Sequence, residues 1–284
     1  MFWQTSRFRI DLSRPQVMGI VNVTPDSFSD GGHHATAAQA LRHAEQLLTQ
    51  GADLLDIGGE STRPGSPAVP LAEELARVLP VVREAVRLGA PISVDTYKPE
   101  VMQAVLDLGA DVINDIWALR QPGAREAVAR HPSCGVCLMH MHRDPQTMQT
   151  QPLDGDVIPA VNAFLEQELD RLLVLGVEAE RVMLDAGIGF GKTVMQNFAL
   201  LARQSELSVR GLPWLAGWSR KSSLGAVTGL PVEQRLVPSI SAAVLAVDRG
   251  ARVVRVHDVQ ETRAALQVWQ AMCNAERPDT QQEA

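Results

Sequence analysis

The stretch that decides the fold runs from Val182 to Lys192 and reads VMLDAGIGFGK. It begins with a short apolar segment typical of a buried strand, reaches a carboxylate at Asp185, and continues into a glycine-rich loop. The same arrangement recurs along the chain: an apolar run, a polar residue at its carboxyl end, a loop, and then a helical pattern. Eight such units can be counted, and they predict a parallel sheet in which each strand is followed by a helix.

The predicted strands are residues 17–21, 54–57, 92–94, 112–113, 135–139, 182–184, 214–218 and 253–257. A weak internal repeat supports this count, because Gly51, Gly109 and Gly250 each lie between a helical pattern and the next strand. Glycine at that point is typical of the left-handed end of a helix. Eight units predict a single-domain (βα)8 TIM barrel over residues 1–275, followed by a polar tail at 276–284. An open doubly wound sheet stays open as the alternative, since strand count alone does not determine closure.

The composition is that of an ordinary globular protein, with 45% hydrophobic residues, 21% charged residues and a net charge of −7. The negative charge argues against nucleic acid or an anionic membrane as the main partner. The N-terminus lacks the apolar segment of a signal peptide, and no run of about 18 apolar residues predicts a membrane span. Three cysteines cannot form a disulfide framework, so we expect a reducing, cytoplasmic location.

Active sites of TIM barrels lie at the carboxyl ends of the strands. The polar residues expected there are Asn22, Thr62, Arg63, Asp95, Asn114, His140, Asp185, Lys221, Arg255 and His257. A carboxylate accepts two hydrogen bonds from a guanidine-like edge, so Asp95, Asn114 and Asp185 suit a flat heterocycle with adjacent N–H donors. The cationic side chains suit a phosphate group. Any one of these residues could be a simple turn residue, but chance explains the whole set poorly.

Several motifs closely resemble those of the dihydropteroate synthase family of folate-pathway enzymes, which bind a pterin. They are NVTPDSFSDG at 22–31, GGESTRPG at 58–65, SVDT at 93–96, ND at 114–115, GFGK at 189–192, SRKS at 219–222 and RVHD at 255–258. The family joins 6-hydroxymethyl-7,8-dihydropterin pyrophosphate to 4-aminobenzoate and releases pyrophosphate. The resemblance runs from about Val17 to Glu261, and the motifs follow the family's order.

The resemblance implies a role for each matching residue. It assigns pterin binding to Asp95, Asn114, Asp185 and Lys221. Pyrophosphate binding falls to Asn22, Thr62, Arg63, Ser219, Arg255 and His257, and Asn22 would also meet the accompanying Mg2+. The aminobenzoate pocket would be formed by Thr62, Arg63, Pro64, Phe190, Lys221 and Ser222. The catalytic group would be Arg63, Lys221, Arg255 and His257. The resemblance also implies a homodimer formed through helices late in the chain.

No nucleophile paired with a base is visible, so we expect no covalent intermediate. The residues favour a dissociative, SN1-like course in which the bond to pyrophosphate breaks first. Loops 22–32 and 58–65 are expected to be mobile and to close over the site. The chain lacks room for an added pyrophosphokinase domain, so a single function is expected.

The chain departs from the family pattern at four positions. Ala186 stands where proline is usual, Ile188 where phenylalanine or methionine is common, Trp218 where a smaller residue is common, and Pro238 where glycine is common. These departures concern the loop after Asp185 and the fit of the substrate rather than the reaction.

Four other interpretations compete with this one. Residues 186–193 nearly match a phosphate-binding Walker A loop, but Ala186 replaces its first glycine. Cys134 and Cys137 form a C-x-x-C near His140 and His142, a pattern that can indicate a redox or zinc site. Cys137 lies in an apolar strand, however, where cysteine usually acts as a small buried hydrophobic residue. A methyltetrahydrofolate-dependent methyltransferase has a similar pterin pocket but no pyrophosphate to bind. A pterin-binding paralogue without turnover is a fourth alternative.

Overall fold

The computed structural model describes residues 1–24, 33–62, 65–144, 147–148 and 150–275. In this part of the chain, eight parallel strands close into a barrel in the order β10-β3-β4-β5-β6-β7-β8-β9, with β9 pairing back onto β10. These strands are β3 (Gln16–Asn22), β4 (Leu54–Gly58), β5 (Ile92–Asp95), β6 (Val112–Asp115), β7 (Gly135–Met139), β8 (Val182–Asp185), β9 (Trp214–Ala216) and β10 (Val253–Val256). The prediction of a TIM barrel is confirmed, and the doubly wound alternative is wrong.

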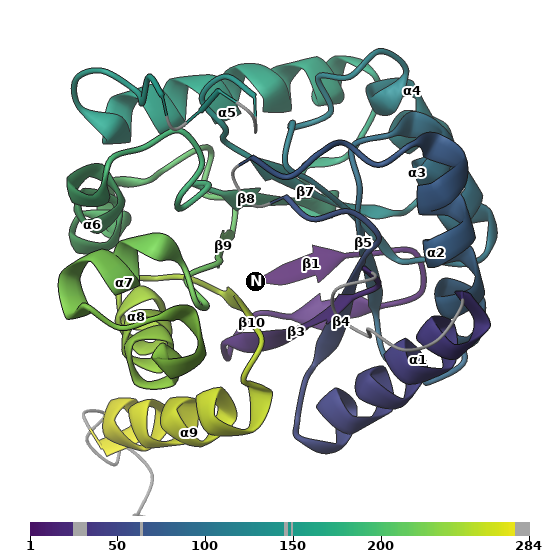
Figure 1. Cartoon of the computed structure of the whole chain (residues 1–284). Coiled ribbons are helices and arrows are strands. Elements are labelled where there is room, and N and C mark those ends of the chain that lie inside the picture. Colours follow the sequence, from purple (N-terminus) through teal and green to yellow (C-terminus); the bar gives the residue numbers. More distant parts are fainter. Residues whose placement is uncertain (25–32, 63–64, 145–146, 149, 276–284) are drawn as a thin grey trace, which may run out of the picture.

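Helices surround the strands as an outer ring (Figure 1). Those that follow the first six barrel strands are α1 (His33–Thr49), α2 (Leu71–Ala85), α3 (Pro99–Asp107), α4 (Ala124–Arg130), α5 (Val157–Val174) and α6 (Val194–Ala202). Strand β9 is followed by two helices, α7 (Ser222–Thr228) and α8 (Leu236–Asp248), and β10 by α9 (Val259–Ala275). In the described residues, the pattern of one α-helix after each barrel strand is exceeded at β9, where α7 begins at the last residue of the SRKS motif.

Two of the predicted strands run further than the observed ones. The seventh strand ends at Ala216 rather than Trp218, and the eighth ends at Val256 rather than His257. The pairing of β9 with β10 involves only Leu215 and Ala216, so the residues that follow are free to turn across the mouth. The side chains of residues 217–222 and of His257 thus come from loops rather than from strands.

The N-terminal residues form an antiparallel hairpin of β1 (Phe2–Gln4) and β2 (Arg9–Asp11), which the sequence analysis did not predict. Figure 1 shows β1 in the middle of the ring of barrel strands. Trp3 is fully buried, and its indole Nε1 donates to the carbonyl of Arg181, directly before β8, at 2.9 Å. The hairpin therefore closes the N-terminal end of the barrel, opposite the expected active site.

The inside of the barrel changes character along its axis. Near the hairpin it is apolar, where Trp3, Ile10 and Leu12 pack against Met18, Leu54, Val112, Cys137, Met183, Leu215 and Val253. Towards the carboxyl ends of the strands the inner residues become polar. A larger apolar core lies between the strands and the outer helices. Within the described residues, no helix combines the length and the apolar character that a membrane crossing requires.

Candidate active site

The carboxyl ends of the strands surround a cavity of about 490 Å3, a volume within the usual range for small-molecule sites. Eleven of the thirteen residues predicted for the site line it, namely Asn22, Thr62, Asp95, Asn114, Asp185, Phe190, Ser219, Lys221, Ser222, Arg255 and His257. The other two, Arg63 and Pro64, lie outside the described residues, as do residues 25–32 of the predicted loop at 22–32. All of these described residues therefore come together at one cavity. His140, which was also expected at the strand ends, does not line it; its buried ring packs against Phe164 with ring centres 4.9 Å apart.

Asp95 and Asn114 form one side of the cavity floor. They are direct neighbours in the pairing of β5 with β6, and both are buried. Burial raises the pKa of Asp95 to about 7, and the nearby Arg255 guanidinium opposes that shift. The Arg255 Nη2 donates to the Asp95 carboxylate at 2.9 Å. Asp95 is therefore poised between its neutral and ionised forms near neutral pH.

Beneath this pair lies Asp56, which was not among the residues predicted for the site. Its carboxylate is fully buried and accepts hydrogen bonds from Ser93 Oγ at 2.6 Å, Asn114 Nδ2 at 3.1 Å and Arg255 Nε at 2.5 Å. A charged residue in an apolar strand must find such partners, because an unpaired buried carboxylate is costly. Asp56 interrupts the apolar run from Leu54 to Ile57, and this interruption was the signal by which the sequence could have indicated a functional residue here.

Asp185 lies at the end of β8 and faces the cavity. Its Oδ1 accepts the backbone N–H of Gly187 at 2.7 Å. Burial raises the pKa of Asp185, and this N–H and the nearby Lys221 oppose the rise. Gly187 has a positive φ of 65°, and a Cβ there would lie 1.9 Å from the carbonyl oxygen of His140. Only glycine fits this turn, so the glycine-rich loop is shaped by its close approach to β7.

Lys192 ends the glycine-rich loop but faces away from any phosphate site. Its side chain is buried, and its Nζ donates to the carbonyls of Gly187 at 2.9 Å, Phe190 at 3.1 Å and His140 at 3.3 Å. Burial lowers its pKa to about 7. A Walker A lysine must reach a nucleotide phosphate, so this arrangement contradicts the nucleotide-binding interpretation.

Cationic and hydroxyl groups also line the cavity. The Lys221 Nζ lies 4.4 Å from the centre of the Phe190 ring, and burial lowers the pKa of Lys221 to about 8. Ser219 Oγ accepts the backbone N–H of His257 at 3.1 Å and lies 2.9 Å from His257 Nδ1. This contact fixes the imidazole ring with Nε2 on its far edge.

Arg235 also lines the cavity and was not predicted. Its guanidinium donates to the carbonyls of Leu230 at 3.0 Å and Arg220 at 3.2 Å. It packs so closely on α7 that a Cβ on Gly225 would lie 2.3 Å from its Nη2. The turn before α7 is thus held by Arg235, which is 14 residues beyond Lys221 in the sequence and could not be linked to it by pattern.

The loop that carries Thr62 is tied to the next one by a network of charged groups. Lys98 Nζ forms ion pairs with Glu60, at 2.5 Å, and with the buried Glu74. Tyr97 adds a hydrogen bond from its hydroxyl to Glu60 at 3.0 Å. These contacts hold the start of the loop after β4 against the loop after β5.

Comparisons with known proteins agree with this geometry. A family model described as pterin binding enzyme matches residues 18–257. A dihydropteroate synthase of Neisseria meningitidis serogroup B is 49% identical over 276 residues, which cover 95% of this chain and 97% of that protein. The chain belongs to the dihydropteroate synthase family.

Solved structures of this family share the fold. The Burkholderia cenocepacia dihydropteroate synthase in complex with 7,8-dihydropteroate is 49% identical with a TM-score of 0.89, covering 97% of this chain and 98% of that one. The Xanthomonas albilineans dihydropteroate synthase with 4-aminobenzoic acid is 50% identical with a TM-score of 0.88, covering 93% of this chain and 95% of that one.

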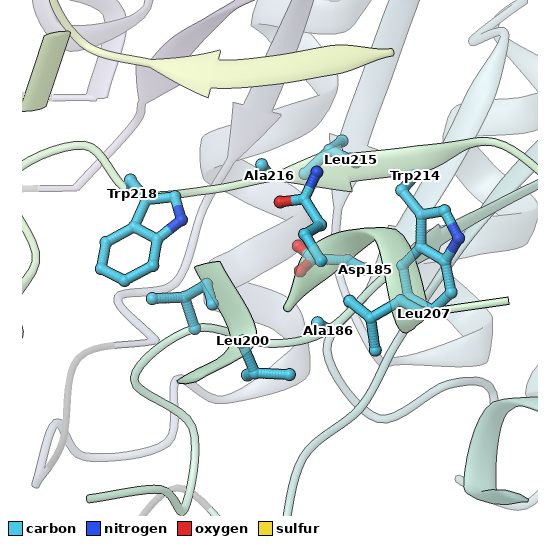
Figure 2. Close-up of a pocket in the computed structure, with 10 residues that line it drawn as sticks. Asp185, Ala186, Leu200, Leu207, Trp214, Leu215, Ala216 and Trp218 are labelled. Carbon is cyan, nitrogen blue, oxygen red and sulfur yellow. The ribbon is translucent and has the colours of Figure 1, made fainter. Parts of the chain in front are cut away.

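Three of the four departures from the dihydropteroate synthase pattern meet at one place. Ala186, Ile188 and Trp218 line a second, very small cavity of about 10 Å3 behind Asp185, which is about the size of one water molecule. Figure 2 shows Trp218, Ala186 and Trp214 around it. Trp218 is buried and packs against Phe198 with ring centres 5.4 Å apart. These departures therefore form one packing unit, beneath the glycine-rich loop.

The cysteine motif does not form a site. Cys134 and Cys137 are unpaired thiols with no exposed surface, and Cys134 lies 3.2 Å from the Arg181 guanidinium. Among the residues that the structure describes, no group of three or more His, Cys, Asp or Glu side chains could hold a metal ion. The interpretation of Cys137 as a buried hydrophobe is confirmed.

Proposed function

We propose that this chain condenses 6-hydroxymethyl-7,8-dihydropterin pyrophosphate with 4-aminobenzoate to form 7,8-dihydropteroate and pyrophosphate. One observation carries the proposal: a single cavity is lined both by carboxylates with an amide and by cationic side chains. The first set suits the heterocycle and the second suits the leaving group. Membership of the dihydropteroate synthase family supports the same reaction.

The pterin would occupy the floor between Asp95, Asn114 and Asp185. The pterin edge presents adjacent N–H donors, and each carboxylate accepts such donors in pairs. Both carboxylates are buried, so water competes weakly for their oxygens. Lys221 would donate to an acceptor on the ring. Ionisation of Asp95 would strengthen binding, because the ionised form accepts hydrogen bonds with both oxygens.

The pyrophosphate would lie against Arg255, His257 and Ser219, with Thr62 and Arg63 reaching it from the loop after β4. Asn22 ends β3 at the cavity wall and offers an amide oxygen. Mg2+ prefers oxygen ligands and usually keeps several waters while it binds substrate phosphates. A single amide oxygen at the rim fits a Mg2+ that arrives with the pyrophosphate. When bound, that ion would offset charge on the leaving group.

The aminobenzoate would bind beside Phe190, between Lys221 and Ser222. The Phe190 ring offers an apolar face of the right size for an aromatic ring, and it lies against the Lys221 ammonium. The Ser222 hydroxyl and the Lys221 cation suit a carboxylate. Thr62, Arg63 and Pro64 would complete this pocket from above.

The reaction would follow a dissociative course. The bond between the pterin methylene carbon and the pyrophosphate oxygen breaks, and its electron pair leaves with oxygen. The resulting cation is delocalised into the dihydropterin ring, where the carboxylates stabilise it. The aniline lone pair then forms the new C–N bond, and the nitrogen loses one proton to the departing pyrophosphate. A secondary isotope effect well above unity at the methylene carbon is expected, and a value near unity would contradict this order.

The direct test is to incubate the purified chain with the dihydropterin pyrophosphate, 4-aminobenzoate and Mg2+. We expect dihydropteroate and pyrophosphate in equal amounts, and no product when either organic substrate is omitted. Pterin binding without product would instead indicate the methyltransferase relative or the turnover-deficient paralogue. Absence of both binding and product would contradict the proposed substrate itself.

A homodimer is also proposed, as the family resemblance implies. Val237 and Leu245 lie two turns apart on one face of α8 and are 69% and 43% exposed. Apolar side chains on a common exposed face are typical of protein interfaces. Val237→Glu should convert the dimer to monomer in sedimentation, whereas Val174→Glu, at a residue that is 86% exposed on α5, should not. A monomeric unmodified chain would contradict the proposal.

A cytoplasmic location is proposed as well, and the unpaired cysteines support it.

A further inference from the structure

Asp56 is a fully buried carboxylate to which the proposed function assigns no role. On β4 it lies two residues before Gly58, which is the neighbour of Asp95 in the sheet. Its side chain is fully buried, and it lies beneath the described residues that line the large cavity rather than among them. Any effect on a ligand must therefore pass through the side chains that Asp56 contacts.

The first such side chain is the amide of Asn114. An amide has a donor end and an acceptor end, and the two can exchange places by rotation of the group. The Nδ2 of Asn114 donates to Asp56 at 3.1 Å. Because a carboxylate accepts and cannot donate, this contact holds the amide with its Nδ2 towards Asp56. The Oδ1 is then presented as an acceptor to the cavity, which Asn114 lines.

The second is the guanidinium of Arg255. Its Nε donates to Asp56 at 2.5 Å and its Nη2 to Asp95 at 2.9 Å, so two points of a rigid plane are held. The remaining Nη1 meets no acceptor among the described residues. An arginine held at two points loses less freedom when it binds a phosphate than one that moves. Both contacts therefore orient groups of the proposed substrate site.

We propose that Asp56 is a positioning residue that determines which polar atoms of Asn114 and Arg255 face the pterin pyrophosphate. The inference rests on the proposed function, because it takes the ligand from there. A carboxylate at this depth is expensive to bury, and an apolar residue would suit strand β4 better. A role in orienting two neighbours accounts for a carboxylate at this position.

The test uses Asp56→Ala, which removes the acceptor, and Asp56→Asn, which removes the charge but keeps one acceptor oxygen. The matched control is Asp111→Asn. Asp111 is equally buried and is paired with Arg7 at 2.6 Å, but it lies just before β6, at the opposite end of the barrel. Thermal unfolding identifies variants that lose only stability. Binding is measured by calorimetry with 6-hydroxymethylpterin and with its 2-oxo analogue, which lacks the exocyclic amine.

We expect Asp56→Ala to weaken pterin binding about tenfold to a hundredfold. It should also reduce the preference for pterin over the 2-oxo analogue, because Asn114 is then free to rotate its donor into the cavity. Asp56→Asn should fall between Asp56→Ala and the unmodified chain. Asp111→Asn should change unfolding but neither affinity nor preference. Loss of stability alone would not alter the preference of the folded molecules between two ligands.

Equal affinity and equal preference in folded Asp56→Ala would overturn the proposal for Asp56. That outcome leaves the proposed function intact, because the unmodified chain still binds pterin and makes product. Failure of the unmodified chain to bind pterin would instead contradict the proposed function. Pyrophosphate inhibition gives an independent check, since Asp56→Ala should weaken it at least as much as it weakens pterin binding.

Discussion

The Nη2 of Arg255 donates to the carboxylate of Asp95 at 2.9 Å, so a residue of strand β10 and a residue of strand β5 meet across the mouth of the barrel. Arg255 contributes the cation that opposes the burial of Asp95. The two residues were assigned to different parts of the substrate from the sequence. The structure shows that they form one unit, so changing either one should affect both parts of the substrate.

Arg255→Ala should therefore have two effects. Pyrophosphate inhibition should weaken about tenfold or more, while the KM for 4-aminobenzoate changes little, because Phe190 and Ser222 are the residues proposed for the aminobenzoate side. The pKa of Asp95 should also rise further when the opposing cation is lost. The inhibition constant of pyrophosphate and the KM for 4-aminobenzoate measure the first effect. Weaker aminobenzoate binding with unchanged pyrophosphate inhibition would refute this division of roles.

The pH dependence follows from two shifted groups. The pKa of Asp95 is raised to about 7, so its acceptor form is gained as the pH rises through about 7. The pKa of Lys221 is lowered to about 8, so its charge is lost as the pH rises through about 8. A plot of kcat/KM against pH should thus be a narrow bell, and its two limbs should report the pKa values of these groups in the free enzyme. Protonation of Asp95 alone should weaken pterin binding about tenfold when the pH falls from about 8 to about 6.

Lys221→Arg separates the two limbs, because a guanidinium keeps its charge throughout this range. The alkaline limb should disappear in this variant, whereas the acid limb should stay near pH 7. An alkaline limb that persists unchanged would assign it to another group.

Asp185→Asn should reduce pterin affinity about tenfold to a hundredfold while the fold is kept. The side chain has the same shape, and its Oδ1 can still accept from Gly187, but an amide presents a donor where the pterin needs an acceptor. Calorimetry with 6-hydroxymethylpterin measures the affinity, and circular dichroism reports the fold. Unchanged pterin binding would remove Asp185 from the site.

Lys192→Met should lower the free energy of unfolding by about 2–4 kcal/mol, because three carbonyls lose their shared donor. The matched control is Arg203→Met, whose exposed ion pairs with Asp156 and Glu206 are expected to contribute little. Denaturant unfolding compares the two. A loss at Arg203 as large as that at Lys192 would contradict the view that burial makes the difference.

Trp3→Ala tests the hairpin at the far end of the barrel. We expect a loss of about 3–5 kcal/mol, since a fully buried aromatic side chain is removed. The melting temperature should fall by about 10 °C. Because Trp3 is remote from the cavity, KM values measured well below the melting temperature should be unchanged. A change in KM without a change in melting temperature would show that the two ends of the barrel are linked.

The positions of the site residues could be predicted because a closed parallel barrel brings every strand end to one mouth. Knowing that Asp95, Asn114 and Asp185 each follow an apolar run was sufficient to place them together. The glycines that end helices made the count of units secure. Fold and site were thus predicted by the same repeated pattern.

Other features depend on contacts that no local pattern reveals. The hairpin has strands of three residues, too short to show alternation. Arg235 reaches the site because α7 carries Gly225 at the point of contact, which is a property of packing. Lys192 resembles a phosphate-binding lysine in sequence, and only its three carbonyl partners show otherwise. Asp56 carried a signal, a charge within an apolar strand, but its partners come from β5, β6 and β10.

The most direct test of the proposed site is a crystal structure of the chain with an unreactive dihydropterin pyrophosphate analogue and 4-aminobenzoate. We expect the pterin edge on Asp95, Asn114 and Asp185, with the phosphates against Arg255 and His257. The aminobenzoate ring should lie beside Phe190. A pterin bound outside the barrel mouth, or phosphates bound at the glycine-rich loop near Lys192, would contradict the assignment.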